Sequence, residues 1–411
     1  MNAPPCLPVR SRACVRASLA MLFAAVLLGG CGGGSERPGS APSPSPAPAP
    51  APAPAAANVA PIVVDGGTDG TAFNSPFVSV TVCQPGTSTC ATVDRVVVDT
   101  GSYGLRLAAS AVPAAIALPR VAAPGGAALG ECTPFASGFA WGSVRTADVA
   151  VAGERASAIP IQLVDDPSGG FGTPPASCSN TGPNFGVGSG ARGILGVGFL
   201  TQDCGDGCTT SPPPAVYYAC STAGCSPTTV PLASQVSNPV ASFATDNNGV
   251  AIVLPTVPLG GVVSISGSLI FGVGTQPNNQ PGSARVFSVN RQGNFTTNYK
   301  GTNLSAFIDS GSNALFFPDA SLPQCSGGFY CPTSAQQLSA TMSAPNGSSA
   351  TVDFFVESVN ALRADAAVGH AGGAIGSRVF DWGLPFFFGR TVWVGISGSS
   401  TPLGPGPFWA F

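Results

Sequence analysis

The sequence predicts a mostly β fold built from two related halves. From Pro61 onward, short runs rich in β-branched and aromatic residues are separated by glycine and proline. The chain of 411 residues has 54 glycines and 41 prolines, a composition that favours strands and turns over long helices. The stretch VVVDTGSYGLRL at 96–107 recurs as AFIDSGSNALFF at 306–317. An internal repeat of this kind predicts two similar units in one chain.

The expected strands follow one another along both halves. They include PFVSVTVC, RVVVDTG, VRTADVAVAG, GVAIVLP, VVSISGSLIFG, SAFIDSG, TVDFFVESV and TVWVGIS. Helical signals are scarce, and SAQQLSATM at 334–342 is one of the few stretches expected to form a helical turn or two. A second element, GILGVGF at 193–199, is matched with GAIGSRVF at 373–380. We therefore expect an N-terminal β lobe at 61–260 and a C-terminal β lobe at 261–411.

Residues 1–30 are expected to form a lipoprotein signal peptide. Three arginines precede ASLAMLFAAVLLGG, an apolar stretch too short to span a bilayer comfortably. The stretch ends in LGGC, which resembles a bacterial lipobox and implies that Cys31 is the lipid-modified first residue of the mature protein. The following Gly32 is similar to the start of Gram-negative lipoproteins of the outer membrane. The alternative is a soluble secreted protein whose signal ends near a cysteine.

Residues 31–60 are expected to be a disordered tether behind the lipidated cysteine. They alternate proline with alanine and have no core-forming pattern, which favours extended polyproline II. At about 3.1 Å per residue, such a segment holds the folded part up to roughly 90 Å from a membrane anchor. We expect an exported lipoprotein of the cell envelope, attached to the membrane through its lipid.

The cysteines predict a disulfide-bonded protein. Of 13 cysteines, two leave with the signal and Cys31 carries lipid, which leaves an even number for an oxidising compartment. A four-cysteine zinc knuckle in CGDGC and CSTAGC is the less favoured alternative. Proximity in sequence predicts Cys83 with Cys90, Cys325 with Cys331, Cys132 with Cys178, and two bridges among Cys204, Cys208, Cys220 and Cys225.

Composition and motifs disfavour several classes of function. A net charge of -3 with only 16 lysines and arginines gives no basic stripe for nucleic acid. The single histidine, His370, and the lack of a G-x-S-x-G motif disfavour a serine-hydrolase triad. No phosphate loop or dinucleotide fingerprint follows a strand and opens a helix. We expect neither a metal nor an organic cofactor, and His370 is interpreted as a loop residue.

With VVVDTGS and AFIDSGS in matching places, the chain resembles the pepsin-like aspartic proteases. The resemblance implies two β lobes related by a pseudo-twofold axis, each supplying one Asp-Thr/Ser-Gly loop to a cleft that binds an extended peptide. It extends by motif order over most of residues 70–400, through GSLIFG and GAIGSRVFDWGLPFFFGRTVWVGI. The particular form is similar to a bacterial lipoprotein domain family whose function is not established.

The resemblance assigns roles to both loops. Asp99 and Asp309 would form a dyad that shares one proton, because two facing carboxylates do not both ionise cheaply. The supporting residues would be two glycines that let backbone N–H groups approach, two hydroxyls that bond across the axis, and two serines that donate to the carboxylates. These are, in that order, Gly101 and Gly311, Thr100 and Ser310, Ser102 and Ser312.

Two positions depart from the family's pattern. Phe135 stands where the family carries a tyrosine on a hairpin that closes over the substrate, and Trp141 is the expected substitute. Arg106 stands where an aromatic residue supports that tyrosine; ordinary packing or a surface position is the alternative for both departures.

From these features we interpret the chain as a monomeric, membrane-anchored aspartic endopeptidase that cleaves extended peptides or unfolded proteins. The alternative is an inactive pepsin-like lipoprotein that acts as a binding or scaffold module at the cell envelope. A plain disulfide-rich structural lipoprotein is a third interpretation, which the repeat of the Asp loops disfavours.

Overall fold

The computed structural model describes residues 56–168, 170–210, 215–290, 292–362, 366–376 and 378–411. The expected signal peptide, Cys31 and all but the last residues of the expected tether lie outside these ranges. Within these ranges, no helix is long and apolar enough to cross a membrane.

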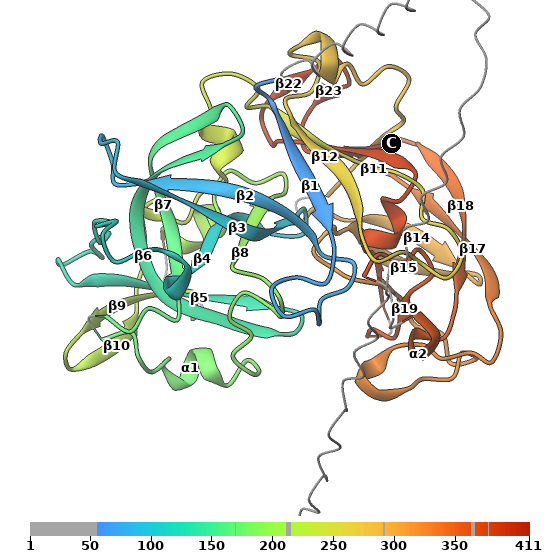
Figure 1. Cartoon of the computed structure of the whole chain (residues 1–411), viewed down its shortest axis with the longest axis horizontal. Helices are drawn as coiled ribbons and strands as arrows, with labels where there is room; N and C mark the ends of the chain where they lie inside the picture. The colour runs from blue at the N-terminus through green and yellow to red at the C-terminus, as the bar shows by residue number, and fades with distance from the viewer. Residues whose placement is uncertain (1–55, 169, 211–214, 291, 363–365, 377) are drawn as a thin grey trace, which may run out of the picture. The chain divides into compact units, whose positions relative to one another are not determined.

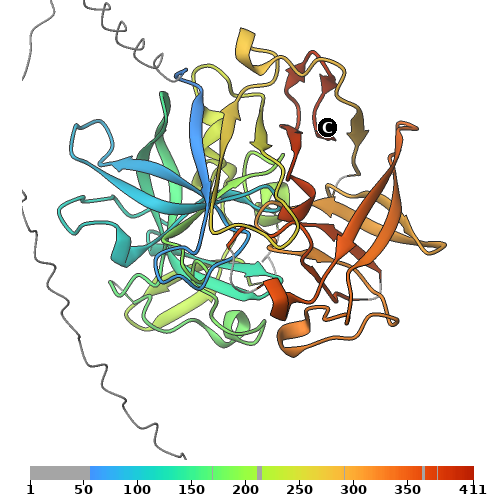
Figure 2. The same cartoon turned by 45° about the vertical axis from the view of Figure 1, so that its right-hand side comes forward.

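The larger of the two main sheets has 15 strands and contains the first Asp loop (Figures 1 and 2). Strands before and after residue 260 both take part in this sheet, so it contains strands from both of the expected lobes. In sheet order the strands are β10 (Gly224–Pro227), β9 (Tyr217–Ser221), β5 (Ala128–Phe135), β6 (Gly138–Val151), β7 (Glu154–Val164), β4 (Tyr103–Ala108), β8 (Gly193–Val197), β3 (Cys90–Asp99), β2 (Pro76–Cys83), β1 (Val59–Val64), β12 (Ile265–Phe271), β11 (Gly249–Leu254), β21 (Arg390–Gly395), β24 (Phe408–Ala410) and β13 (Val286–Ser288).

The second main sheet has seven strands and contains the second Asp loop. In both views its strands, coloured orange to red, lie on the other side of β1, β11 and β12 from the blue and green strands β2 to β9 (Figures 1 and 2). In sheet order they are β18 (Ser349–Val356), β17 (Gln336–Ser343), β14 (Phe295–Tyr299), β15 (Thr302–Ile308), β20 (Val379–Trp382), β16 (Leu315–Phe316) and β19 (Gly372–Gly373). A separate pair is formed by β22 (Ser400–Thr401) and β23 (Gly404–Pro405).

Helices in the described residues are single turns, as the glycine and proline content predicts. The α-helical turns are α1 (Ala176–Ser179) and α2 (Val359–Leu362). The 3₁₀ turns are η1 (Ala109–Ala111), η2 (Gly205–Cys208), η3 (Leu232–Ser234), η4 (Pro239–Ser242), η5 (Pro277–Asn279), η6 (Ser326–Gly328) and η7 (Leu384–Phe386). The expectation of a mostly β protein is confirmed.

The helical turn expected at 334–342 is wrong. These residues belong to β17, which pairs antiparallel with β18 from Gln336↔Val356 to Ser343↔Ser349. Ala340 and Met342 alternate with more exposed neighbours on this strand. The period is therefore two, and Gln337, Ser339 and Ser343 occupy the outer face of a hairpin strand rather than of a helix.

The match of 373–380 with 193–199 is also wrong. β8 lies parallel to β3, with Val98 opposite Leu195, and β20 lies parallel to β15, with Ile308 opposite Trp382. The segment that pairs with the second Asp strand is thus VFDW at 379–382, which shares only Val379 and Phe380 with the expected element GAIGSRVF. The Asp within this segment breaks the apolar pattern on which the match relied.

The disulfide pattern is confirmed. Every disulfide predicted from proximity in sequence is present. The two bridges whose pairing was left open each join cysteines that are adjacent in the order of the sequence. The pairs are Cys83–Cys90, Cys132–Cys178, Cys204–Cys208, Cys220–Cys225 and Cys325–Cys331.

Candidate active site

The two Asp loops lie against each other at the ends of β3 and β15. Each loop follows a strand buried in the main hydrophobic core, through Val98 and Ile308. A Cβ added to Gly101 would lie 2.6 Å from Cγ of Asp309, and one added to Gly311 would lie 2.7 Å from Cγ of Asp99. Such approaches exclude any larger residue, so both glycines are required for the carboxyl groups to face each other.

Four hydrogen bonds join the two loops reciprocally. The hydroxyl of Thr100 donates to the Ile308 carbonyl at 3.0 Å and accepts from the Ser310 amide at 3.0 Å. The hydroxyl of Ser310 donates to the Val98 carbonyl at 2.7 Å and accepts from the Thr100 amide at 3.1 Å. Each buried hydroxyl thus satisfies a donor and an acceptor of the other loop, which fixes the spacing of the two strands.

Each carboxyl group accepts the same pair of bonds from its own loop. Asp99 accepts from the Gly101 amide at 2.8 Å and from the Ser102 hydroxyl at 2.5 Å. Asp309 accepts from the Gly311 amide at 2.8 Å and from the Ser312 hydroxyl at 2.8 Å. The supporting residues expected from the sequence therefore contact either a carboxyl group of the pair or the opposite loop.

The surroundings of the two carboxyl groups favour a proton on Asp309. Burial raises the pKa of Asp309 well above its usual range, and the charges of Asp99 and Asp381 and a hydrogen bond with Asp99 add to this. Burial beside the same dyad also raises the pKa of the Tyr103 hydroxyl. A carboxyl that keeps its proton near a second carboxyl is able to donate to an oxygen while its neighbour accepts.

The dyad opens into a cavity of about 510 Å³. Asp99 is 7% exposed, and Asp309 is partly buried on the other side of the same space. The lining is a mixture of aromatic and aliphatic side chains with the small polar residues of the loops. A concave, partly apolar space with a few converging polar groups is the usual form of a small-molecule or peptide site.

The tip of the β5–β6 hairpin covers part of this cavity. Phe135, with Ala136 and Ser137, lines the cavity and packs on Phe185 at a ring-centroid distance of 5.4 Å. The Phe139 amide donates to the Pro183 carbonyl at 3.0 Å, and Cys132–Cys178 links β5 to α1. This hydrogen bond and this disulfide hold the hairpin in place. At its tip, Phe135 contributes an apolar ring where a tyrosine would add a hydroxyl.

Trp141 lies elsewhere, against the expected role at the substrate. Its side chain is 2% exposed and packs with Phe171 and Tyr218, outside the cavity lining. Its indole N–H donates to the Phe171 carbonyl at 2.8 Å. Because its only polar atom is satisfied in the core, Trp141 supports the base of the hairpin.

Arg106 is a buried junction between the first Asp loop and the hairpin. It is 1% exposed. Its guanidinium donates to the Tyr103 carbonyl at 2.6 Å and to the Thr133 hydroxyl at 3.0 Å. It also donates to Glu131 and Asp203, each at 2.8 Å. The interpretation as an ordinary surface position is excluded, because two strands and a loop meet at this side chain.

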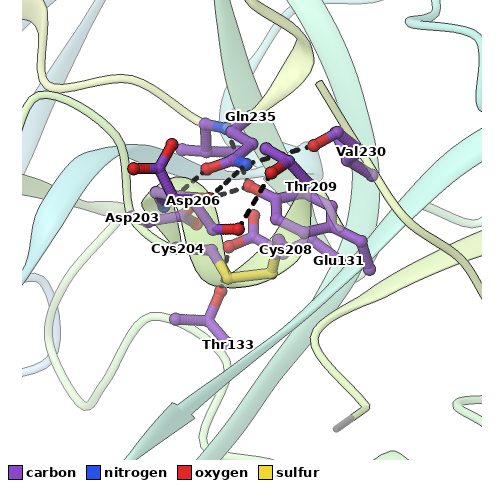
Figure 3. Close-up of a disulfide and its surroundings, with 12 residues drawn as sticks. Glu131, Thr133, Asp203, Cys204, Asp206, Cys208, Thr209, Val230 and Gln235 are labelled. Atoms are coloured by element: carbon purple, nitrogen blue, oxygen red, sulfur yellow. Dashed lines mark hydrogen bonds between the residues drawn. A yellow bond between two sulfur atoms is a disulfide. The ribbon is translucent and has the colours of Figure 1, made fainter. Parts of the chain in front are cut away.

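The loop that carries Asp203 is closed by the Cys204–Cys208 disulfide (Figure 3). Gln235 accepts from the Gly205 amide at 2.7 Å and donates to the Gly205 carbonyl at 2.9 Å. The Tyr217 hydroxyl donates to Asp203 at 2.6 Å. The disulfide and these bonds hold the Asp203 carboxyl next to the Arg106 guanidinium.

One proton balances the two acids around Arg106. Burial raises the pKa of Asp203 well above its usual range, and the charge of Glu131 raises it further. Burial acts in the same direction on Glu131, but the Arg106 charge and hydrogen bonds from its neighbours outweigh it and lower the pKa. A charged Glu131 beside Arg106 and a neutral Asp203 leave the buried cluster without net charge.

Replacing Asp203 by Asn should make stability less dependent on pH. In the unfolded chain Asp ionises near pH ~4, whereas folded Asp203 keeps its proton, so its stabilisation is full below that pH and is lost as pH rises. The free energy of unfolding in urea, measured from about pH 4 to about pH 8, should rise in the variant relative to wild type by up to ~1.4 kcal/mol per pH unit. A difference that stays constant across this range would contradict a neutral Asp203.

Sequence reasoning missed Asp381, which lines the same cavity. The available signal was an acid within the apolar run VFDWGLPFFF at 379–388. It also missed Tyr103 and Phe185, because nothing local distinguishes these aromatic residues from core residues. In the described part of the chain, no three His, Cys, Asp or Glu side chains gather in a way that could hold a metal ion.

This fold is that of the aspartic proteinases. The crystal structure of an aspartic proteinase from Irpex lacteus superimposes with a TM-score of 0.52 and 16% sequence identity, covering 86% of this chain and 97% of that chain. The chain belongs to a family of proteins of unknown function, DUF3443, whose model matches residues 54–411. No curated protein matches the sequence.

Proposed function

We propose that this protein is an aspartic endopeptidase that hydrolyses peptide bonds with a water molecule activated by Asp99 and Asp309. The observation that carries the proposal is the pair of carboxyl groups, delivered by two separate strands and held by matching bonds at the floor of one cavity. The fold of an aspartic proteinase supports the class of reaction, and the two loops support the residues.

The proposed reaction needs one shared proton. Asp99 accepts a proton from the water, whose oxygen attacks the carbonyl carbon, while Asp309 donates its proton to the carbonyl oxygen. Asp99 then gives its proton to the amide nitrogen as the C–N bond breaks, and Asp309 takes back a proton from a hydroxyl of the tetrahedral intermediate, which restores the starting state of the dyad. The raised pKa of Asp309, caused first by burial and then by the Asp99 charge, fits the role of acid.

The substrate is proposed to be an extended peptide or an unfolded protein. We propose that the strand groups around β3 and β15 act as two lobes related by an approximate twofold axis, with the peptide lying between them. The reciprocal bonds of Thr100 and Ser310 support this arrangement. Phe135 on the hairpin would pack on the peptide from above.

We further propose that the protein is a monomer anchored to the outer membrane of a Gram-negative bacterium through Cys31. The five disulfides support export to an oxidising compartment. The Pro- and Ala-rich segment would then place the folded part at a distance from the membrane.

The proposal is tested by incubating the full-length protein with an unfolded protein from acid to neutral pH. Peptides should be released, and a peptide with a hydroxyl-bearing carbon in place of the scissile carbonyl should inhibit the release, since it mimics the tetrahedral intermediate. If a folded protein binds that analogue but cleaves nothing at any pH, the endopeptidase proposal is wrong and the inactive binding module is favoured.

A further inference from the structure

The wall of the cavity contains a third carboxyl group, Asp381, which the proposed reaction does not use. Asp381 lies on β20, opposite Phe307 of β15 and Phe316 of β16. Its neighbours Phe380 and Trp382 are fully buried and stack on each other at 4.3 Å. Because side chains alternate along a strand, Asp381 is directed to the opposite side, where it lines the cavity of the dyad.

Asp381 is buried without a full set of partners. It is 3% exposed, and its Oδ1 atom has no hydrogen-bond partner. The Ser312 hydroxyl, which lines the same cavity, donates to Asp309 at 2.8 Å. A buried carboxyl oxygen without a hydrogen-bond partner lowers the stability of the fold. Such an oxygen in a cavity indicates that a group of the bound ligand pairs with it.

The cavity has no positive group of its own. Asp99, Asp309 and Asp381 all line it, and no Lys, Arg or His is among the described residues that do. Burial raises the pKa of Asp381 to about 8, with the charge of Asp99 adding to this and a Ser312 hydrogen bond opposing it. A bound cation would reverse this effect, because an opposite charge favours the ionised carboxyl.

The surroundings of Asp381 suit a long cationic side chain. Phe316 and Ile375 line the same cavity and offer apolar surface for a methylene stem. The dyad is close by, since the Asp309 amide donates to the carbonyl of Trp382, the residue after Asp381, at 3.0 Å. A side chain that reaches Asp381 therefore belongs to a residue at or next to the bond that the dyad attacks.

We propose that Asp381 is a specificity-determining residue, which accepts a hydrogen bond from a lysine or arginine side chain flanking the scissile bond. This inference rests on the proposed endopeptidase function. It adds a preference within that function, for peptides with a cationic residue beside the cleaved bond.

The test compares matched peptides that carry lysine or norleucine at each of the two positions flanking the cleaved bond. In the full-length wild-type protein, kcat/KM should favour lysine at one position. In Asp381→Asn, this preference should fall by about 30-fold, as expected when one partner of a buried charged pair is removed. Cleavage of the norleucine peptide by the same variant gives the reference rate, so the ratio of the two rates reports the lysine preference apart from any effect of Asp381 on the pKa of Asp309. Asp353→Asn, which alters an exposed carboxylate of β18, is the matched control.

Two further measurements keep the outcomes distinct. Asp381→Leu should reverse the preference toward norleucine, which tests the inference if Asp381→Asn does not fold. Dissociation constants of the same peptides, made uncleavable by a hydroxyl-bearing carbon at the scissile position, report selection without catalysis. Selection in binding without cleavage would contradict the endopeptidase but support the role of Asp381. An equal lysine preference in wild type and both variants would overturn that role.

Discussion

Replacing Asp309 by Asn should lower kcat/KM for peptide cleavage by on the order of 10³–10⁴-fold, because the amide has no proton to give to the carbonyl oxygen at the required step. The variant should fold, since the amide oxygen can accept from the Gly311 amide in place of Oδ1, and the amide nitrogen in place of Oδ2 can donate to the Ser312 hydroxyl oxygen. Its stability at neutral pH should rise, because a neutral amide avoids the burial of an ionisable carboxyl beside the Asp99 charge, which raises the pKa of Asp309. Initial cleavage rates and urea unfolding measure the two effects.

The matched variants separate a dyad from two independent acids. Asp99→Asn should be as inactive as Asp309→Asn, and the double variant should be no worse than either one, because the two groups act as a unit. Asp353→Asn, which changes an exposed residue outside the lining of the dyad cavity, should retain full activity. If the Asp309→Asn protein, freed of contaminating proteases, still cleaves peptides at the wild-type rate, Asp309 is not a catalytic residue.

The parts of the site that could be predicted from the sequence are those that produce a recognisable local pattern of residues. Asp99 and Asp309 each follow a buried strand and precede the same small residues, so the internal repeat was enough to pair them across the chain. The disulfides were predictable for a similar reason, since four of the five bridges join cysteines at most 7 residues apart.

The parts that were missed depend on contacts between distant segments. Arg106 donates hydrogen bonds to Glu131 and Asp203, 25 and 97 residues away, and no local sequence pattern indicates such partners. Asp381 interrupts the apolar run of the strand beside β15, which moved the expected repeat element to the preceding segment. In β17 the outward-facing glutamine and serine residues masked an alternation that only the pairing with β18 makes clear.

Replacing Arg106 by Met should lower the free energy of unfolding by about 3–5 kcal/mol, the usual cost of leaving a buried charge without its partner. Methionine keeps an unbranched, flexible stem at this buried position, so the loss reports mainly the missing guanidinium. Glu131 already has one oxygen, Oε2, without a partner, and it would lose Arg106, the cationic side chain with which it forms an ion pair in the described residues. Arg155→Met, at an exposed position on the neighbouring strand β7, should change stability by no more than about 0.5 kcal/mol.

Neutralising the abandoned acid should restore much of that loss. In the double variant Arg106→Met with Glu131→Gln, the buried cluster again has no net charge if Asp203 keeps its proton, so stability should recover by about 2 kcal/mol or more relative to Arg106→Met. Urea unfolding of the single and double variants forms a thermodynamic cycle that isolates this pair. If Glu131→Gln destabilises the Arg106→Met protein as much as it destabilises wild type, the two side chains are not coupled. Arg106 would then act through its bonds to Tyr103 and Thr133 alone.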